Sequence, residues 1–318
     1  MQTKSFTCEI VSPVFMNGAD TRRPSLRSSG LKGILRFWWR AAHPNLENAK
    51  RKQQEQQIFG GTLSLGDKKD KRTQPRKSSL ILQIRGKPFF TTNDLIPHKR
   101  NIGRNSPSAS FGPGERFEIV FRLRNSEFCS IEKLEALLKI SALLGGIGRR
   151  TRRGMGGFIV LDQENPQTLD SNGEALKEIA GLLQILNPEV YTWEKEKQCI
   201  LPLDTYTQPY PFIKQIQIGE KSWSDLDALL LHIGKCTSTL HGQYKKKGEE
   251  NSYQKALGAG RPRFASPVYV SVVKIGTSFH PIITQLNAQP PKDRKLEHVK
   301  TFPNTIRTSF IKHVLQLS

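Results

Sequence analysis

The chain has 318 residues, enough for about two ordinary domains, and carries 49 lysines and arginines against 28 aspartates and glutamates. The formal net charge of +21 favours a polyanionic partner, either nucleic acid or an anionic membrane. The membrane is poorly supported, because the sequence has no run of about 18 apolar residues, no apolar signal core at its N-terminus and no lipidation signature. We therefore expect a cytoplasmic protein that binds nucleic acid.

The cysteine pattern points to a reducing compartment. The four cysteines are far apart and form no Cys-x-x-Cys pair. We expect reduced, buried thiols and neither a disulfide frame nor a zinc site at Cys8, Cys129, Cys199 and Cys236.

The first half of the chain predicts six elements in the order β-α-β-β-α-β. Alternating apolar residues predict a first strand at 4–11, and the helix expected at 31–42 has an N-cap candidate in the Ser-Ser-Gly segment 28–30. The remaining predicted elements are two strands, a helix and a strand, at 79–85, 117–123, 131–144 and 158–161. This order is typical of a ferredoxin-like (RRM-like) domain.

The second half repeats the order less cleanly, after a plausible linker at 163–173. Its predicted helices and strands lie at 174–186, 199–205, 223–240 and 267–275. We interpret it as a second, more degenerate ferredoxin-like domain. The predicted fold class is therefore α+β, with tandem ferredoxin-like domains at 1–165 and 166–318.

The most informative segment is 145–158, which holds six glycines and four arginines between a predicted helix and a predicted strand. Glycine lets backbone N–H groups approach a ligand closely, and the arginine guanidinium matches phosphate. The residues predicted to contact RNA here are Gly146, Gly148, Arg149, Arg150, Arg152 and Arg153. The alternative is a glycine-rich turn whose arginines pair with acidic groups of the same protein, although acidic residues are scarce.

The helix expected at 31–42 carries a second basic feature. Lys32, Arg36 and Arg40 are spaced i, i+4, i+8, so they share one face, which we expect to be exposed and to contact RNA. Ordinary amphipathicity is the alternative. Trp38 and Trp39 are expected to be core or interface residues rather than platforms for bases.

Other basic segments give weaker signals. Arg261 and Arg263 lie in a turn before a predicted strand, where RNA contact and an ordinary surface turn are equally plausible. The tracts 66–79, 99–114 and 245–247 are expected to be solvated basic loops that add non-specific attraction to phosphate.

Catalytic signals are weak. The seven histidines form no H-x-x-x-H or H-E-x-x-H pair, and no nucleophile elbow, Walker A or EF-hand pattern is present. His43, after the first helix, is the least implausible general base for RNA cleavage, but a residue interacting with the helix dipole is the simpler interpretation. We therefore expect no catalytic residues, no metal and no cofactor.

Four segments carry a resemblance to a known family. The helix segment 29–41, the IFGG at 58–61 and the glycine-rich segment 145–158 resemble motifs of the RAMP superfamily of CRISPR-associated proteins. The segment 261–267 resembles a motif of its second domain. The first two together resemble most closely the first RAMP subunit of the type III-B (Cmr) effector complex.

The resemblance implies tandem ferredoxin-like folds and a non-catalytic RNA-binding subunit in antiviral defence, near the 3′ end of the CRISPR RNA. The implied partners are the CRISPR RNA, its complementary target RNA, the backbone and terminal RAMP subunits and the small helical subunit. Whether guide, target or both are contacted stays open. The alternatives are a RAMP-fold endoribonuclease that processes CRISPR transcripts and a stand-alone protein that binds single-stranded RNA.

Overall fold

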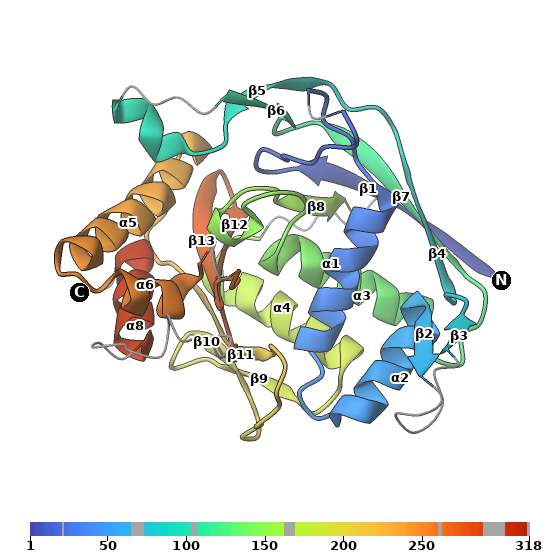
Figure 1. Ribbon diagram of the computed structural model, residues 1–318. Coiled ribbons are helices and arrows are strands. Elements are labelled where there is room, and N and C mark those ends of the chain that lie inside the picture. Colours follow the sequence, from blue (N-terminus) through green and yellow to red (C-terminus); the bar gives the residue numbers. More distant parts are fainter. Residues whose placement is uncertain are drawn as a thin grey trace.

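Two larger antiparallel sheets alternate with two layers of helices in the computed structural model (Figure 1). The α+β class and the tandem ferredoxin-like arrangement predicted from the sequence are confirmed. The structure describes residues 1–20, 22–64, 73–102, 107–161, 169–259, 263–288 and 303–316.

The first sheet belongs to the N-terminal half. In spatial order its strands are β4 (Leu80–Arg85), β7 (Arg116–Leu123), β1 (Gln2–Ile10) and β8 (Phe158–Leu161). Neighbouring strands are antiparallel, and β7 separates β1 from β4, as in the split βαβ unit of a ferredoxin-like domain. Helices α1 (Ser28–Ala41) and α3 (Ile131–Leu144) pack against this sheet, on the face that buries Phe6, Cys8 and Ile10.

Two insertions interrupt the predicted order. The first, between α1 and β4, contains α2 (Asn48–Phe59) and the hairpin of β2 (Gly61–Ser64) and β3 (Thr73–Arg76). The second, between β4 and β7, contains β5 (Phe90–Asp94), the 3-10 helix η1 (Pro97–Ile102) and β6 (Pro107–Phe111). The described parts of the tracts 66–79 and 99–114 therefore include regular structure, so the expectation of loops throughout is wrong.

The second sheet has the spatial order β12 (Val268–Ile275), β13 (Ser278–Leu286), β11 (Ile213–Ile218), β10 (Cys199–Pro202) and β9 (Tyr191–Glu194). Strand β13 separates β11 from β12, so the split βαβ pattern recurs. The strand on the other side of β11 is β10, which precedes β11 in the chain. The second domain thus departs from the regular fold, because the strand beside its first core strand comes earlier in the chain instead of last.

The helices of the second half are α4 (Asn172–Leu186), α5 (Leu226–Lys246), α6 (Glu250–Leu257) and α8 (Pro303–Leu315). The predicted helix 223–240 begins later because the Asp225 side chain caps it, accepting from the N–H groups of Asp227 and Ala228. It also continues through Lys246, so the expected polar loop at 245–247 is wrong. The predicted N-cap at 28–30 is wrong too, because Ser28 is already helical and Arg27 precedes it without a side-chain cap.

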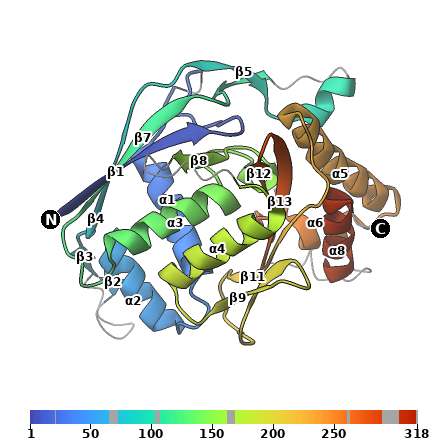
Figure 2. The same cartoon turned by 180° about the vertical axis from the view of Figure 1, so that it is seen from behind.

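The two halves share a core. Helices α3 and α4 pack side by side, and both contact strands of the second sheet, while α3 also contacts β8 of the first (Figure 2). On the opposite face of the second sheet, α5, α6 and α8 pack together (Figure 1). The alternating residues Val268, Val270 and Val272 of β12 face that outer helical layer, as the sequence predicts, while Tyr269 and Val273 face the first domain. The predicted domain boundary between 165 and 166 lies outside the described residues.

No helix in the described ranges is both long enough and apolar enough to span a bilayer.

Candidate nucleic-acid interface

Helix α1 presents one apolar and one basic face. Leu31, Leu35 and Trp38 are buried against the core, at the spacing expected for an amphipathic helix. Trp38 is only 1% exposed, and its indole lies so close to Gly145 that a Cβ there would strike Nε1. The expectation that Trp38 and Trp39 are core residues is confirmed, because both are buried.

The basic face of α1 is not a simple exposed stripe. Lys32 Nζ donates to Ser78 Oγ at 2.8 Å and to Leu80 O at 3.4 Å, and burial lowers the pKa of its amine. Arg36 and Arg40, each about one-third exposed at 34% and 35%, share the carboxylate of Glu55 at 2.8 and 3.0 Å. The expectation of a fully exposed face is therefore wrong, because the inserted helix α2 supplies an acidic partner.

Arg36, Arg40 and Glu55 line a groove of about 780 Å³ between α1 and α2, which we call the α1–α2 groove. Arg36 and Arg40 come from α1, while Arg51, Lys52 and Glu55 come from α2. Arg51 is 5% exposed, donates to Glu55 Oε2 at 3.3 Å, and has a pKa lowered by burial. Four cations and one carboxylate thus line the described wall of this groove, and three of the cations contact that carboxylate.

The second domain closes one side of the α1–α2 groove. The Tyr210 ring lies 4.0 Å from the Arg51 guanidinium, and its hydroxyl donates to His43 O at 2.9 Å and Leu46 O at 2.6 Å. Asn187 likewise donates to Ala42 O at 2.9 Å. Because these donors satisfy carbonyls at and beyond the C-terminal end of α1, the helix is held rigidly against the second domain.

The sequence predicted only the α1 side of this groove. It identified Arg36 and Arg40, but not Arg51, Lys52, Glu55 or Tyr210. The one signal available was the i, i+4 spacing of Arg51 and Glu55 within a strongly polar helix.

The first half of the glycine-rich loop 145–158 is folded onto the protein itself. A Cβ on Gly146, whose φ is 100°, would strike the carbonyl of Gly156, and one on Gly148, whose φ is 94°, would lie 2.6 Å from Phe15 O. The Gly146 N–H donates to Ser141 O at 2.8 Å, and the Arg149 N–H to Phe15 O at 2.8 Å. These glycines therefore permit close backbone packing within the fold.

The second half of the loop docks on the edge strand of the second sheet. It forms a short 3-10 helix, η2 (Thr151–Arg153), and the Gly154 N–H donates to Val270 O of β12 at 2.7 Å. Arg153 donates to Val268 O at 3.1 Å and more weakly to Leu257 O and Ser266 Oγ, both at 3.4 Å. Burial lowers the pKa of Arg153 to about 10. This arginine is thus held by carbonyl and hydroxyl groups of the second domain.

The other loop arginines point to separate environments. Arg149 is exposed, while Arg150 adopts a left-handed conformation with φ of 61° and has a pKa lowered by burial. The Arg152 guanidinium lies 4.3 Å from the Tyr269 ring and 5.7 Å from the Phe37 ring. Because Phe37 also lines the α1–α2 groove, the structure brings Arg152 to the edge of that groove.

The last predicted pair is only partly described. Arg263 is exposed beside a short bridge between Ala259 and Phe264, and Arg261 lies outside the described residues.

The RAMP superfamily model matches residues 7–159 of the chain, which include β4 and β7, parts of β1 and β8, and the glycine-rich loop. This part of the chain is therefore similar to the RAMP superfamily. The expected resemblance to the RAMP superfamily and its Cmr subunits is confirmed.

Relatives and solved structures agree with this similarity of the chain. It is 28% identical over 179 residues to CRISPR system Cmr subunit Cmr1-2 of Pyrococcus furiosus, covering 49% of this chain and 93% of the relative. The apo crystal structure of Cmr1 from Pyrococcus furiosus matches with a TM-score of 0.56 and 18% identity, over 99% of this chain and 97% of that one. A chain of a type III-B Cmr-beta complex bound to cognate target RNA matches with a TM-score of 0.57 and 13% identity, over 98% and 99%. At these identities the structural matches show a shared fold along the whole chain.

His43 of the first domain is placed unfavourably for acid–base chemistry. It is 8% exposed, its Nδ1 lies 2.6 Å from Trp39 O, and its ring stacks on Trp39 at 4.4 Å. Burial lowers the pKa of His43 to about 4, so the imidazole is neutral at physiological pH. His43 thus contacts a carbonyl in the last turn of α1, at the helix C-terminus as the simpler interpretation expects, but as a neutral ring rather than a charge on the helix dipole.

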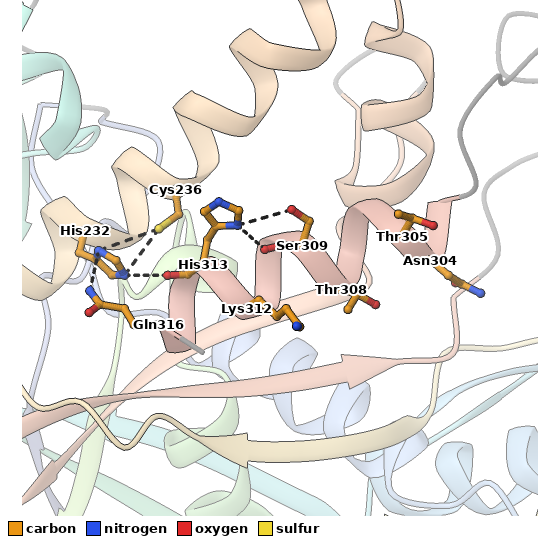
Figure 3. A pocket seen from close by; sticks show the side chains of 9 residues that line it. All are labelled: His232, Cys236, Asn304, Thr305, Thr308, Ser309, Lys312, His313 and Gln316. Atoms are coloured by element: carbon orange, nitrogen blue, oxygen red, sulfur yellow. Dashed lines mark hydrogen bonds between the residues drawn. The ribbon is translucent and has the colours of Figure 1, made fainter. Parts of the chain in front are cut away.

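A second concavity, of about 930 Å³, lies between α5 and α8 (Figure 3). Cys236 Sγ lies 3.5 Å from His232 Nε2, which is itself 3.2 Å from the carbonyl oxygens of His313 and Val314. Burial raises the pKa of Cys236 to about 11, so the sulfur is a thiol at neutral pH. In the described part of the chain no three His, Cys, Asp or Glu side chains are grouped as metal ligands would be. This concavity supplies neither a thiolate nor a metal-ligand set there.

Proposed function

We propose that this chain is a non-catalytic RNA-binding subunit of a type III-B (Cmr) CRISPR effector complex. The observation that carries the proposal is the α1–α2 groove, where Arg36, Arg40, Arg51 and Lys52 lie on the described wall with one carboxylate, that of Glu55, in a segment that matches the RAMP superfamily. Such an excess of positive charge in a concave site attracts a polyanion and releases its counterions on binding.

The comparisons support membership of the complex. The relative that shares 28% identity is a subunit of a CRISPR Cmr system, and one structural neighbour is a chain of a Cmr complex bound to target RNA. The proposed partners are accordingly the CRISPR RNA, a complementary target RNA, the backbone and terminal RAMP subunits and the small helical subunit. We place the chain near the 3′ end of the CRISPR RNA, as the resemblance implies.

The proposed contacts are to the RNA backbone. Arg36 and Arg40 in the groove, with Arg149 and Arg152 of the loop, are the exposed or half-exposed cations on neighbouring elements. Guanidinium contacts to phosphate position a strand without reading its bases, which suits a subunit that must accept any guide. The remaining predicted contacts are assigned supporting roles in the fold at Lys32, Gly146, Gly148, Arg150 and Arg153, and weaker electrostatic roles at Arg261 and Arg263.

The test is a binding titration of the full chain with unrelated single-stranded RNAs at increasing salt. Affinity should vary little with sequence, and its logarithm should fall linearly with log salt, by about 0.7 for each phosphate contacted. Co-expression with the other Cmr subunits should recover the chain in the complex, and crosslinking should place it near the guide 3′ end. Sequence-specific affinity with a flat salt response would contradict the proposal.

The competing function, a RAMP-fold endoribonuclease, is tested with the same protein. Repeat RNA incubated with the chain, with and without divalent metal, should remain intact. Specific cleavage that disappears in His43→Ala while the fold is retained would establish the nuclease instead.

A further inference from the structure

We infer that the α1–α2 groove is a phosphodiester-binding site in which Glu55 is a positioning residue that holds Arg36 and Arg40 as a paired fork for RNA. The inference rests on the proposed function. It adds to that function the location of the site and the residues that α2 contributes. It also assigns to an acidic side chain, Glu55, a role that favours RNA binding although its charge repels RNA.

Glu55 uses both of its oxygens to hold guanidinium groups. Its Oε1 accepts from Arg36 Nε at 2.8 Å and from Arg40 Nη1 at 3.0 Å, and forms an ion pair with Arg36 Nη2 at 2.8 Å. Its Oε2 is 3.3 Å from Arg51 Nη1. The carboxylate side chain is only 6% exposed, so it is enclosed beneath the arginines that it binds.

The arginines keep donors for a ligand. Within the described ranges, Arg36 Nη1, Arg40 Nε and Arg40 Nη2 have no protein acceptor, and both side chains remain about one-third exposed, at 34% and 35%. Two guanidiniums fixed on one carboxylate are side by side, each with N–H groups left over. Since an arginine held in place loses less side-chain entropy on binding, this arrangement is preorganised for an anion.

Arg51 gives a second, independent indication of a ligand. Its side chain lines the groove and is 5% exposed, and its Nε has no hydrogen-bond partner in the described part of the protein. Its other nitrogens are engaged, Nη1 with Glu55 and Nη2 with Asn48 Oδ1 at 2.7 Å. A buried donor without a partner costs about 1–3 kcal/mol, so the wall of the groove carries a cation whose hydrogen bonding within the described residues is incomplete.

RNA is the occupant that the surroundings favour. Planar guanidinium forks match the oxygens of a phosphate. Arg152 reaches Phe37 at the groove edge, so the cationic surface continues from the groove toward the loop 145–158, as an extended polyanion requires. Lys52, exposed on the opposite wall, adds an ordinary electrostatic contact.

The decisive variant is Glu55→Gln, which keeps the shape but removes the negative charge. If Glu55 positions the arginines, Glu55→Gln binds RNA about tenfold more weakly although the protein has become more positive, the loss expected for one charge-assisted hydrogen bond. If Glu55 only neutralises the groove, the same variant binds RNA more tightly. The matched control is Glu9→Gln, which breaks an ion pair with Arg116 at 2.9 Å on β1 and changes the net charge equally.

Binding is measured by fluorescence anisotropy with a labelled oligouridylate and the full chain, after circular dichroism and thermal melting establish that each variant is folded. If Glu55→Gln does not fold, Arg36→Gln combined with Arg40→Gln replaces it and should lower the salt slope by about 1.4, two single-strand contacts. Equal or tighter binding by Glu55→Gln, an unchanged slope in the double variant, or equal competition by oligoglutamate overturns the inference. Failure of the parent chain to bind any RNA would instead refute the proposed function.

Discussion

In the α1–α2 groove, three arginines from two helices converge on one carboxylate, whereas in the loop 145–158 four arginines within five residues point to separate partners. The groove is built around Glu55, and its outer guanidiniums keep donors that face solvent. The loop arginines are divided among carbonyl groups, aromatic rings and solvent. A high density of arginine in the sequence therefore does not measure how much positive charge is available to a ligand.

Gly154, Arg152 and Arg153 of the loop join the two domains. The Gly154 N–H pairs with Val270 at the edge of the second sheet, which covers an edge strand that would otherwise be exposed. A Cβ on Gly154 would lie 2.8 Å from Leu230 and 3.1 Å from Ile233 of α5. The loop is first a packing element and only at its exposed side a candidate RNA contact.

The largest effect on stability is expected at Trp38, whose buried ring packs beneath both the groove and the loop. Its ring contacts Tyr269 of the second domain at 5.1 Å and lies against Gly145. Trp38→Ala should reduce the free energy of unfolding by about 3–5 kcal/mol, because it leaves a cavity the size of an indole. Urea denaturation measures the change, with the partly buried Ile34→Ala on the same helix as control. A loss below that of Ile34→Ala would mean that the two regions do not depend on a common core.

The elements with a regular apolar pattern could be predicted from the sequence. Leu31, Leu35 and Trp38 mark the buried face of α1, and Val268, Val270 and Val272 mark one face of β12. Helix α2 could not be predicted, because its apolar residues are confined to its ends and it is otherwise polar. Arg51 and Glu55 are buried in α2 only because they satisfy each other and Arg36, a condition that involves two separate helices.

Two further misses have local causes. Strand β13 contains Pro281, which argues against a central strand, but Pro281 lies one residue beyond the last pair of β13 with β11, Ile282 with Ile218. The glycines of the loop indicated a close approach correctly, but Gly146 and Gly148 approach backbone of this chain. A sequence gives the positions where the backbone is free to come close, and only the tertiary structure gives what it comes close to.

The next effect is a pH dependence of stability that comes from His43, which follows the C-terminal end of α1 beside the groove. Its pKa is lowered to about 4 in the native protein against about 6.5 when unfolded, so the unfolded chain binds a proton first as pH falls. Stability should therefore be unaffected above pH 6.5 and should decline between about pH 6.5 and 4, by about 3 kcal/mol in total from this group. Urea midpoints across this range should fall more steeply for the parent than for His43→Gln. Parallel curves would mean that the imidazole is accessible in the native state, which would reopen a catalytic role.

A smaller effect is expected on the loop side, at Arg153. Arg153→Ala removes the N–H groups that donate to Val268 O, Leu257 O and Ser266 Oγ. The free energy of unfolding should fall by about 2–3 kcal/mol. Arg153→Lys should lose most of the same stability, because an ammonium cannot span these acceptors as a planar fork does. The RNA affinity of either variant, measured below its melting temperature, should stay within about twofold of the parent. A stable variant with weakened RNA binding would show that Arg153 belongs with the groove arginines.

The smallest effect on stability is expected at Arg149, and it sharpens the comparison of groove and loop most. Arg149 is the exposed arginine of the loop, and in the described part of the chain its guanidinium contacts only Ser108 Oγ, at 2.8 Å. Arg149→Ala should change stability by less than about 0.5 kcal/mol, as expected for an exposed surface residue. If Arg149 contacts a phosphate, the salt slope for single-stranded RNA should fall by about 0.7, equally for unrelated sequences. Arg149→Lys should keep the parent slope, because the slope counts charge, even if the affinity drops for lack of a bidentate contact. A parent-like slope in Arg149→Ala would limit the RNA site to the groove and the adjoining Arg152 and leave Arg149 for a protein neighbour, so this variant decides whether the exposed side of the loop contributes charge to RNA binding.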